Sequence, residues 1–358
     1  RRTMKISEVI KSLSASNAAI KNTASSEPKE GWYPAYSASG QDVWLPDCRF
    51  TQKGIVVSAV GARCGKAFKA DGKWNICANT HPLSVDETKA LRDYCWYMIN
   101  NEDWWIKGGT AQPFVKVKDS FNRDFIFPPI SEQKMIVSRL DTIQALINQK
   151  QLQIKRLDEL VKARFVEMFK GKYNSFKVDE KLKTTSGGTP KSSVSEYYDG
   201  GDIPWLTSGE VNYGDITKSS NYITEKGLNN SSAKWVPENS IVIAMYGATA
   251  GKVGIVRYKT TTNQAVCSVL PNDNFNQEFL RYAFQDISEE LTSKAIGGGQ
   301  PNISQTIIKN SYIVDAPIEE QERFASFAKQ VDKSKFAVQK SLEKTQLLFD
   351  SLMQEYFD

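Results

Sequence analysis

The chain has 358 residues, 24% of them charged and 40% hydrophobic, with a formal net charge of +5. This composition is typical of a globular protein with room for two or three domains, and no apolar run approaches the roughly 18–20 residues that a membrane span needs. A single histidine and five cysteines without a CxxC pair argue against histidine-based catalysis, a zinc site and a disulfide framework, so we expect a reducing, cytoplasmic compartment.

The first half carries a series of recognisable segments. The turn-rich stretch "GWYPAYSASGQDVW" (31–44) precedes "IVVSAVGARCGKA" (55–67), in which an apolar strand leads into glycines and a lysine. A short amphipathic helix is predicted over Leu91–Ile99, followed by the glycine turn "GGTAQPFV" (108–115) and a strand at Phe125–Phe127. These signals favour a mixed, mainly β domain.

A long helix is predicted next. It opens with Pro129-Ile-Ser-Glu-Gln133, in which the proline suits a helix start and the acidic residue suits the first turn. Apolar residues then recur at alternating spacings of three and four, which is the pattern of a coiled-coil seam. They are Ile136, Leu140, Ile143, Ile147, Ile154, Leu157 and Val161.

The second half repeats the series in the same order. "IVIAMYGATAGKV" (241–253) is followed by a helix over Phe279–Ile287, "IGGGQPNI" (296–303), a strand at Tyr312–Val314 and a second long helix from residue 316. Its seam residues are Phe324, Val331, Val338, Leu342, Phe349 and Leu352. The beginning differs, because "SGGTPKSSVSEYYDGGDIPWLTSGEV" (186–211) has no counterpart in the first half. One scaffold with two dissimilar surfaces suggests two related tasks on two targets.

We therefore expect an α+β protein in which two mixed, mainly β domains are separated by two long antiparallel coiled-coil helices, as a pseudo-twofold internal repeat. The expected boundaries are 1–127 for the first domain, 128–170 for the first helix, 171–315 for the second domain and 316–358 for the second helix. The unlike start of the first domain leaves open that it is shortened at its N-terminus. At about 1.5 Å per residue each helix would span roughly 60 Å. Packing of each helix along its own domain is the alternative to pairing.

The glycine element looks at first like a nucleotide-binding loop. Three residues rather than four separate Gly247 from Gly251, Val253 stands where a hydroxyl should bind magnesium, and the following residues favour a strand over a helix. An ATPase is therefore disfavoured.

The doubled order of these motifs resembles the specificity subunit of type I restriction–modification systems. The matching pieces are Gly187–Pro190, Gly201–Thr207, Gly247–Lys252, Thr262–Gln264, Gly299–Ile303 and Pro317–Gln321 in the second half, and Tyr33–Tyr36, Gly61–Lys66 and Pro129–Gln133 in the first. The resemblance implies two target-recognition domains, each reading one half of a split double-stranded DNA site, with the helices setting the gap. Two readers on one face of B-DNA should lie about one helical turn, roughly 34 Å, apart.

The resemblance also implies partners and an absence of chemistry in this chain. Two DNA adenine methyltransferase (modification) subunits would carry S-adenosylmethionine, and restriction subunits would join to cut unmodified DNA. This chain would be non-catalytic and would bind neither cofactor nor metal. Its sequence agrees, since it has no Asn/Asp-Pro-Pro-aromatic motif for amino methylation and no acidic cluster with nuclease spacing.

Candidate DNA contacts fall into two classes. Glycines beside a lysine let the backbone approach an anion while the lysine supplies charge. The candidates for phosphate contact are Gly61, Arg63, Gly65, Lys66, Gly247, Thr249, Gly251 and Lys252. A tight turn with its lysine in solvent is the alternative.

Base reading needs side chains that donate and accept hydrogen bonds at base edges. The candidates are Ser37, Ser39, Gln41, Gln112 and Lys116 in the first half, and Lys191, Ser192, Thr207, Ser208, Gln300, Asn302 and Ser304 in the second. Gln112 and Gln300 occupy the same place in both halves, which favours a scaffold or phosphate role for them.

The helices also have faces that point away from the seam. Arg156, Glu159, Lys162, Glu343 and Lys344 would be available to the methyltransferase subunits, and an ordinary solvated face is the alternative. A non-enzymatic coiled-coil adaptor with two domains for a protein or carbohydrate ligand is the alternative for the whole chain.

Overall fold

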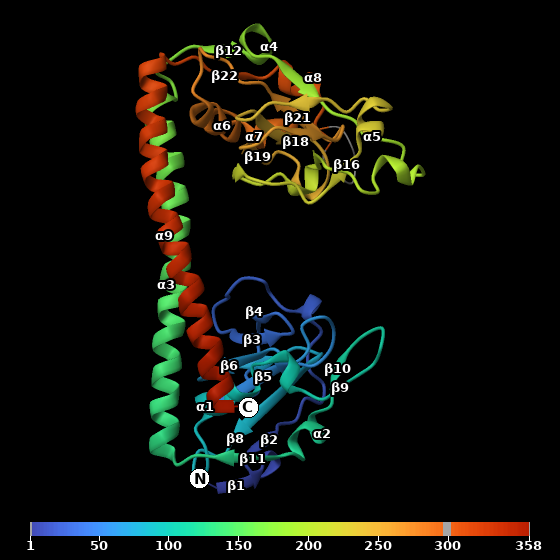
Figure 1. Cartoon of the computed structure of the whole chain (residues 1–358). Coiled ribbons are helices and arrows are strands. Elements are labelled where there is room, and N and C mark those ends of the chain that lie inside the picture. The colour runs from blue at the N-terminus through green and yellow to red at the C-terminus, as the bar shows by residue number, and fades with distance from the viewer. Residues whose placement is uncertain (1, 296–301, 358) are drawn as a thin grey trace. The chain divides into compact units, whose positions relative to one another are not determined.

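The computed structural model of the chain describes residues 2–295 and 302–357 and divides into two compact units. The first unit comprises Arg1–Gln151 with Lys340–Asp358, and the second comprises Leu152–Gln339. Each unit combines a sheet-based domain with one half of each of two long helices, α3 (Ile130–Phe169) and α9 (Ile318–Phe357) (Figure 1). The expected α+β class is confirmed. Within the described ranges, no helix is both long and apolar enough to cross a membrane.

The first unit is built on one four-stranded and one three-stranded sheet. The four-stranded sheet has the antiparallel order β2 (Ile10–Ser12), β8 (Thr80–Val85), β5 (Gly54–Ser58), β6 (Ala67–Ala70). The three-stranded sheet has the order β4 (Gly40–Leu45), β3 (Tyr33–Ser37), β7 (Asn75–Ile76). The other strands and α-helices of this domain are β1 (Arg2–Lys5) paired with β11 (Asp124–Phe127), β9 (Lys107–Gly108) paired with β10 (Phe114–Val115), α1 (Arg92–Ile99) and α2 (Val117–Phe121).

The second unit has a five-stranded and a four-stranded sheet. The five-stranded order is β13 (Thr184–Ser186), β21 (Val266–Val269), β18 (Ile241–Ala244), β19 (Val253–Val256), β15 (Gly214–Ile216). The four-stranded order is β16 (Tyr222–Ile223), β14 (Ile203–Leu206), β20 (Thr260–Thr262), β17 (Trp235–Val236). The other strands and α-helices of this domain are β12 (Ser175–Lys177) paired with β22 (Tyr312–Val314), α4 (Val178–Lys181), α5 (Glu225–Asn229), α6 (Gln277–Asp286), α7 (Ser288–Ser293) and α8 (Gln305–Lys309).

The two units repeat one scaffold. The order β2-β8-β5-β6 in the first corresponds to β13-β21-β18-β19 in the second, and the pair β1–β11 corresponds to β12–β22. The two units are also alike at the ends of β1 and β12. The Lys5 N–H donates to the Glu8 carboxylate and the Lys177 N–H donates to the Glu180 carboxylate, both at 3.2 Å. The second sheets are unlike in strand number and order, in line with the dissimilar lead-ins of the sequence.

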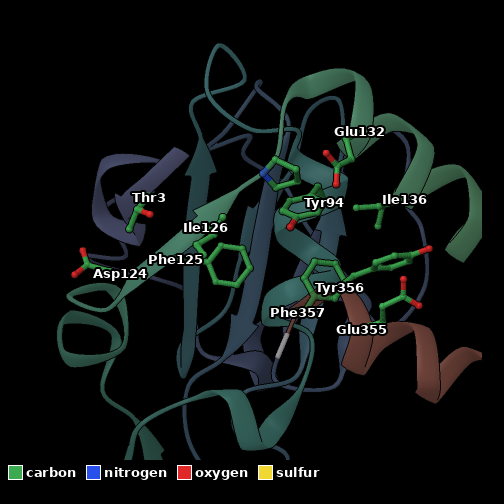
Figure 2. Close-up of a pocket in the computed structure, with 11 residues that line it drawn as sticks. Thr3, Tyr94, Asp124, Phe125, Ile126, Glu132, Ile136, Glu355, Tyr356 and Phe357 are labelled. Carbon is green, nitrogen blue, oxygen red and sulfur yellow. The ribbon is translucent and has the colours of Figure 1, made fainter. Parts of the chain in front are cut away.

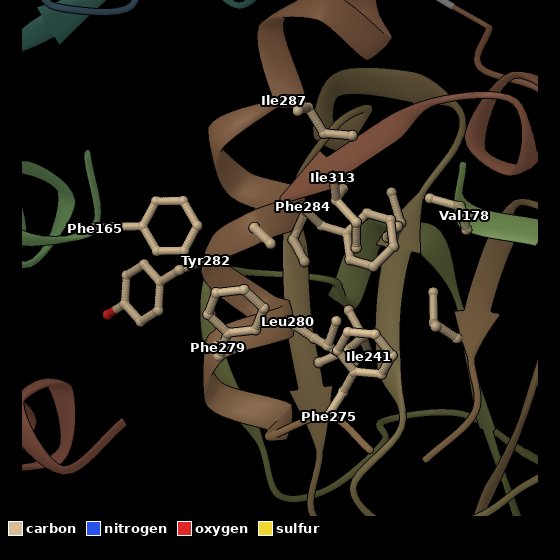
Figure 3. Packing of buried hydrophobic residues seen from close by; sticks show 14 of the residues in the cluster. Phe165, Val178, Ile241, Phe275, Phe279, Leu280, Tyr282, Phe284, Ile287 and Ile313 are labelled. Atoms are coloured by element: carbon tan, nitrogen blue, oxygen red, sulfur yellow. The ribbon is translucent and has the colours of Figure 1, made fainter. Parts of the chain in front are cut away.

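The main core of the second unit lies between its five-stranded sheet, α6 and the ends of the long helices. Phe279 and Phe284 of α6 are fully buried, and Figure 3 shows both among the packed side chains of this core. Phe169 of α3 is also fully buried, and its ring centroid lies 4.9 Å from that of Phe279 and 5.6 Å from that of Phe324. The end of α3 is therefore part of this core, not an appendage to it.

The long helices run antiparallel. In the first unit, Arg139 donates to the Tyr356 hydroxyl at 3.1 Å, and Lys150 donates to the Ser341 hydroxyl at 2.7 Å. Residue numbers thus rise along α3 as they fall along α9.

The same order continues in the second unit. Lys335 donates to Asp158 at 2.5 Å, and the rings of Phe165 and Phe324 lie 5.3 Å apart. Along both halves the seam residues are withdrawn from solvent. Ile136, Leu140, Ile143, Ile147, Val161, Phe324 and Val331 are buried, and Ile154, Leu157, Val338, Leu342, Phe349 and Leu352 are partly buried.

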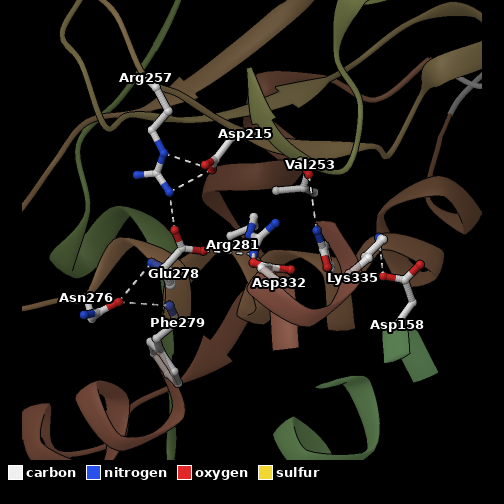
Figure 4. A network of polar contacts seen from close by, with 11 residues as sticks. Asp158, Asp215, Val253, Arg257, Asn276, Glu278, Phe279, Arg281, Asp332 and Lys335 are labelled. Carbon is white, nitrogen blue, oxygen red and sulfur yellow. Dashed lines mark hydrogen bonds and ion pairs between the residues drawn. The ribbon is translucent and has the colours of Figure 1, made fainter. Parts of the chain in front are cut away.

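A polar network fixes α6 to α9 in the second unit (Figure 4). Arg281 is 5% exposed and forms ion pairs with Glu278 at 2.9 Å and Asp332 of α9 at 3.4 Å. Burial raises the pKa of Asp332 above its usual value, and the nearby Arg281 opposes that rise. Because a buried guanidinium without its carboxylates would be costly, these pairs define how the domain sits on the helix.

The Pro-Ile-x-Glu-Gln motif has a structural explanation in both units. Gln133 and Gln321 are 0% and 1% exposed. The side-chain oxygen of Gln133 accepts the N–H of Leu91, the residue before α1, at 2.8 Å, and its amide donates to the Pro128 carbonyl at 2.8 Å. Gln321 joins Asn276, before α6, to Ala316 in the same way, at 2.9 and 2.8 Å. Each glutamine fastens the start of a long helix to the start of a domain helix.

Substituting Gln321 by alanine is expected to destabilise the second unit by about 1–3 kcal/mol, because a part-buried N–H and a buried carbonyl lose their partners. Urea-induced unfolding, monitored by hydrogen exchange at the Asn276 amide, would measure the loss in the free energy of unfolding. Gln330→Ala, at an exposed position of the same helix, is the matched control and should change little. Equal stability of the two variants would contradict this role.

Candidate functional site

The glycine element forms the same hairpin connection in both units. Residues 61–66, the first glycine turn, join β5 to β6, and residues 247–252, the second glycine turn, join β18 to β19. The Gly65 N–H donates to the Ser58 carbonyl and the Gly251 N–H to the Ala244 carbonyl, each at 2.9 Å. Both turns link antiparallel strands, whereas a nucleotide-binding loop would lead from a strand into a helix.

Two glycines in each turn adopt positive φ, for different reasons. In the second turn Gly251 has φ 84°, and a Cβ there would lie 2.7 Å from the side chain of Thr292 in α7. Gly247 has φ 81° and faces open space. Gly65 and Gly61 repeat the pattern with φ 99° and 96°. One glycine of each pair is thus required by packing as well as by φ, while the other leaves the surface of the turn accessible.

The backbone of each turn is partly hydrogen-bonded within the chain. In the second turn the N–H groups of Ala250, Gly251 and Lys252 all donate to carbonyls of the chain. In the first turn those of Cys64, Gly65 and Lys66 do the same. These N–H groups are not available to a phosphate, so charged side chains are its candidate contacts at this end of each turn. Arg63 is exposed and Lys66 half-buried, and the Lys252 ammonium lies 3.2 Å from the Asn212 side-chain oxygen.

The second unit brings several predicted contact residues to the second glycine turn. The Thr249 hydroxyl donates to the Ser208 carbonyl at 2.7 Å, which joins the turn to the segment after β14. Asn302 is exposed and pairs by a β-bridge with Tyr246, immediately before Gly247. Ser208, Thr249 and Asn302 thus lie around one turn although they are far apart in the sequence.

The Gly-Gly-Thr-Pro segment lies against the Thr-Asn-Gln segment. The Gly188 N–H donates to the Thr262 carbonyl at 3.0 Å, and the Thr189 hydroxyl donates to the Gln264 side chain. The Asn263 N–H donates to the Leu206 carbonyl at 3.0 Å, one residue before Thr207. These motifs therefore support the end of β14, from which Thr207 follows.

Glu210 was not anticipated from the sequence and is the most heavily bonded carboxylate in this region. It belongs to a short 3-10 turn, Ser208–Glu210, and accepts hydrogen bonds from both sides of the loop. Burial tends to raise its pKa, but hydrogen bonds from Ser220, Thr207 and Asn221 outweigh that effect and hold the pKa below the usual value. The spacing of Thr207 to Glu210, which matches a capping box, was the signal in the sequence.

Other candidates of the second unit have separate places. Lys191 and Ser192 are exposed in the loop that follows Pro190. Ser304 is exposed, but its hydroxyl oxygen caps α8 by accepting the Ile307 N–H at 3.2 Å. Gln300 lies outside the described residues.

In the first unit the corresponding surface is formed by the first glycine turn and the 112–116 segment. The Gly61 N–H donates to the Pro113 carbonyl at 2.9 Å, so exposed Gln112 lies beside the turn. Phe114, 41% exposed, bridges to Val60 at the place that Asn302 takes in the second unit. Lys116 is exposed two residues further on.

The remaining candidates of the first unit form the tight turn between β3 and β4. Ser39 and Gln41 are exposed there. Ser37 is only 3% exposed, and its hydroxyl oxygen accepts the Ser39 N–H at 3.1 Å. In this conformation Ser37 shapes the turn and does not present its side chain to a base edge.

A pocket of about 490 Å³ lies in the first unit between β11, the start of α3 and the end of α9 (Figure 2). Its walls are aromatic, with Phe125 and Tyr356 among them, and it is bordered by Asp124, Glu132 and Glu355. Three carboxylates would repel a phosphate backbone. This pocket is therefore not part of the candidate anion-binding surface.

Chemistry-bearing groups are sparse in the part of the chain that the structure describes. No group of three or more His, Cys, Asp or Glu residues in it could hold a metal ion. The single histidine, His81, lies on β8, and burial lowers its pKa.

The chain is similar to known proteins over most of its length. Residues 2–156 and 170–347 match the family described as Type I restriction modification DNA specificity domain. The chain is 22% identical over 264 residues to the EcoR124I/EcoR124II type I restriction enzyme specificity subunit of Escherichia coli, with 70% of this chain and 65% of that protein covered. It thus spans slightly less than two thirds of that relative.

Two further comparisons cover more of both chains. The chain is 26% identical to the MjaVIII type I restriction enzyme specificity subunit of Methanocaldococcus jannaschii, with 86% of this chain and 80% of that protein covered. The crystal structure of the type I restriction-modification system S subunit from M. genitalium shares the fold at a TM-score of 0.60 and 14% identity, over 100% of this chain and 96% of that one.

Proposed function

Because the chain belongs to the family of type I restriction–modification DNA specificity domains, we propose that it reads a split double-stranded DNA site, with each unit binding one half. The observation that carries this proposal is the repetition of the lysine-bearing glycine turn on two copies of one scaffold, each beside a different set of exposed polar side chains. The shared turn suits sequence-independent phosphate contact, and the unlike loops suit different base sequences. In this proposal the chain meets its DNA target in the cytoplasm.

The long helices would set the number of base pairs between the half-sites. Each has 40 residues, so at about 1.5 Å per residue each helix is roughly 60 Å long. Their antiparallel contacts in both units support a stiff connection, since two packed helices bend less than a linker does.

The outer helix faces would dock two adenine methyltransferase subunits. Arg156, Glu159, Lys162, Glu343 and Lys344 are exposed, as this role needs. Large apolar side chains accompany them in solvent: Met135, Leu146, Leu347 and Leu348 in the first unit, and Leu152, Leu160, Val166 and Phe336 in the second. Exposed apolar groups on the helices favour docking over a purely solvated face. In this proposal the partners carry S-adenosylmethionine and perform the methylation, restriction subunits join them, and this chain is non-catalytic.

Replacing residues 171–315 by the corresponding domain of another family member is expected to change one half of the methylated site and leave the other half and the gap unchanged. The test is co-expression with the cognate methyltransferase, followed by mapping of methylated adenines across a plasmid. The reciprocal replacement of residues 1–127 is the matched control and should change only the other half. A wild-type chain that directs no methylation to a two-part site, or a swap that alters both halves, would reject the proposal.

A further inference from the structure

One carboxylate organises the loop that carries two candidate base readers. Glu210 Oε2 accepts the Thr207 N–H, the Thr207 hydroxyl and the Asn221 side-chain amide, each at 2.9 Å. Its Oε1 accepts the Ser220 N–H at 2.6 Å and the Ser219 hydroxyl at 3.3 Å. A single side chain therefore joins residues 207 and 219–221, which lie on opposite sides of the loop.

The loop is also bonded to the second glycine turn. The Ser208 carbonyl accepts the Thr249 hydroxyl at 2.7 Å, and Asn212 lies 3.2 Å from the Lys252 ammonium. The fold thus connects the segment suited to base contact with the segment suited to phosphate contact. A displacement of one would be passed to the other through these bonds.

A carboxylate beside DNA would ordinarily be unfavourable, because it repels phosphate. Glu210 is half-buried, and its donors converge on both oxygens. N–H and O–H dipoles aimed at the carboxylate offset its negative field, as they do for bound anions in backbone nests. The group can therefore order the loop at a small electrostatic cost to DNA binding.

We propose that Glu210 is a positioning residue for base recognition by the second unit, holding Thr207 and Ser208 in register with the second glycine turn. The inference rests on the proposed function. It makes a narrower claim, which is that specificity in one half-site depends on a side chain that contacts no base.

Glu210→Gln is the decisive variant, because it keeps the shape and removes the charge. At least three donors to Glu210 are N–H groups, and they approach both of its oxygens. Whichever way the glutamine amide is oriented, its NH₂ would face one of these donors, so hydrogen bonds are lost on one side of the loop. With the full chain and its methyltransferase, a library randomised in both half-sites should show about a tenfold relaxation of base preference in the half-site of the second unit.

Two readouts and two further variants separate positioning from general damage. The preference in the other half-site should not change, and neither should the slope of affinity against salt, since no phosphate contact is removed. Glu238→Gln, which removes an equal charge from an exposed turn of the same unit, should leave both half-sites at wild-type preference. Asn221→Ala, at an exposed residue, removes one donor without threatening the fold and should give a smaller relaxation in the same half-site.

Wild-type preference in both Glu210→Gln and Asn221→Ala would overturn the inference. An equal loss in both half-sites by Glu210→Gln, with no selective change in Asn221→Ala, would overturn it in favour of a purely structural role. If the wild-type complex methylates no two-part site, the proposed function itself fails, and this inference fails with it.

Discussion

Replacing Phe169 by alanine is expected to destabilise the second unit by about 3–5 kcal/mol, the range for a buried phenylalanine that leaves a cavity. Phe169 is fully buried, and its ring packs on Phe165, Phe279 and Phe324. The loss combines removal of apolar contact with an unfilled space among rings that are held by three different helices. Because the chain has two units, hydrogen exchange at the amides of β18 and α6 measures it better than one global transition.

Phe357→Ala is the matched control for that variant. Phe357 takes the equivalent place at the end of α9, but it is only partly buried, with its ring 5.1 Å from that of Tyr94. Truncation of Phe357 should lower the free energy of unfolding by less. It should reduce protection from hydrogen exchange in β5 and α1 of the first unit instead. The role of Phe169 would be refuted if the two variants destabilised equally, or if Phe169→Ala lowered the protection of both units alike.

Local sequence signals predicted the scaffold well. The seam spacing and the Pro-Ile-x-Glu-Gln start indicated two long helices, and α3 and α9 begin one residue after Pro129 and Pro317. The period of the apolar residues also indicated α1 and α6, and the apolar runs before the glycines indicated β5 and β18. These elements are specified by residues close to one another in the chain, so pattern analysis finds them.

Contacts between distant segments were not predictable in this way. Gln133 bonds to Leu91, and Glu210 collects donors from residues 219–221, so neither role is visible in a local pattern. Ser37 was predicted as a candidate base reader, yet it is buried in the sheet. Hydrophobic periodicity reports which face of an element is buried, but the partner of a buried polar group depends on how elements meet. The DNA contacts themselves remain predictions.

Replacing Lys66 and Lys252 together by alanine is expected to weaken DNA binding across all sequences. Each lysine lies in a glycine turn whose last three N–H groups are bonded within the chain, so its ammonium group is a charged candidate for the phosphate contact. Each phosphate contact that is lost lowers the slope of log affinity against log salt by about 0.9, so the double variant should lose about two units of slope. Titration of the chain into a duplex at several salt concentrations measures the slope directly.

The control must lose the same charge elsewhere. Lys53 and Lys183 are exposed and precede β5 and β13, at the ends of the sheets opposite the glycine turns. Lys53→Ala with Lys183→Ala lowers net charge by the same amount, so a general electrostatic effect would shift both double variants equally. If the two lysines contact phosphate, the salt slope of the Lys66 and Lys252 double variant should be shallower than that of the control. Identical slopes would mean that the turns serve the hairpins alone and that the phosphate contacts lie on the variable loops.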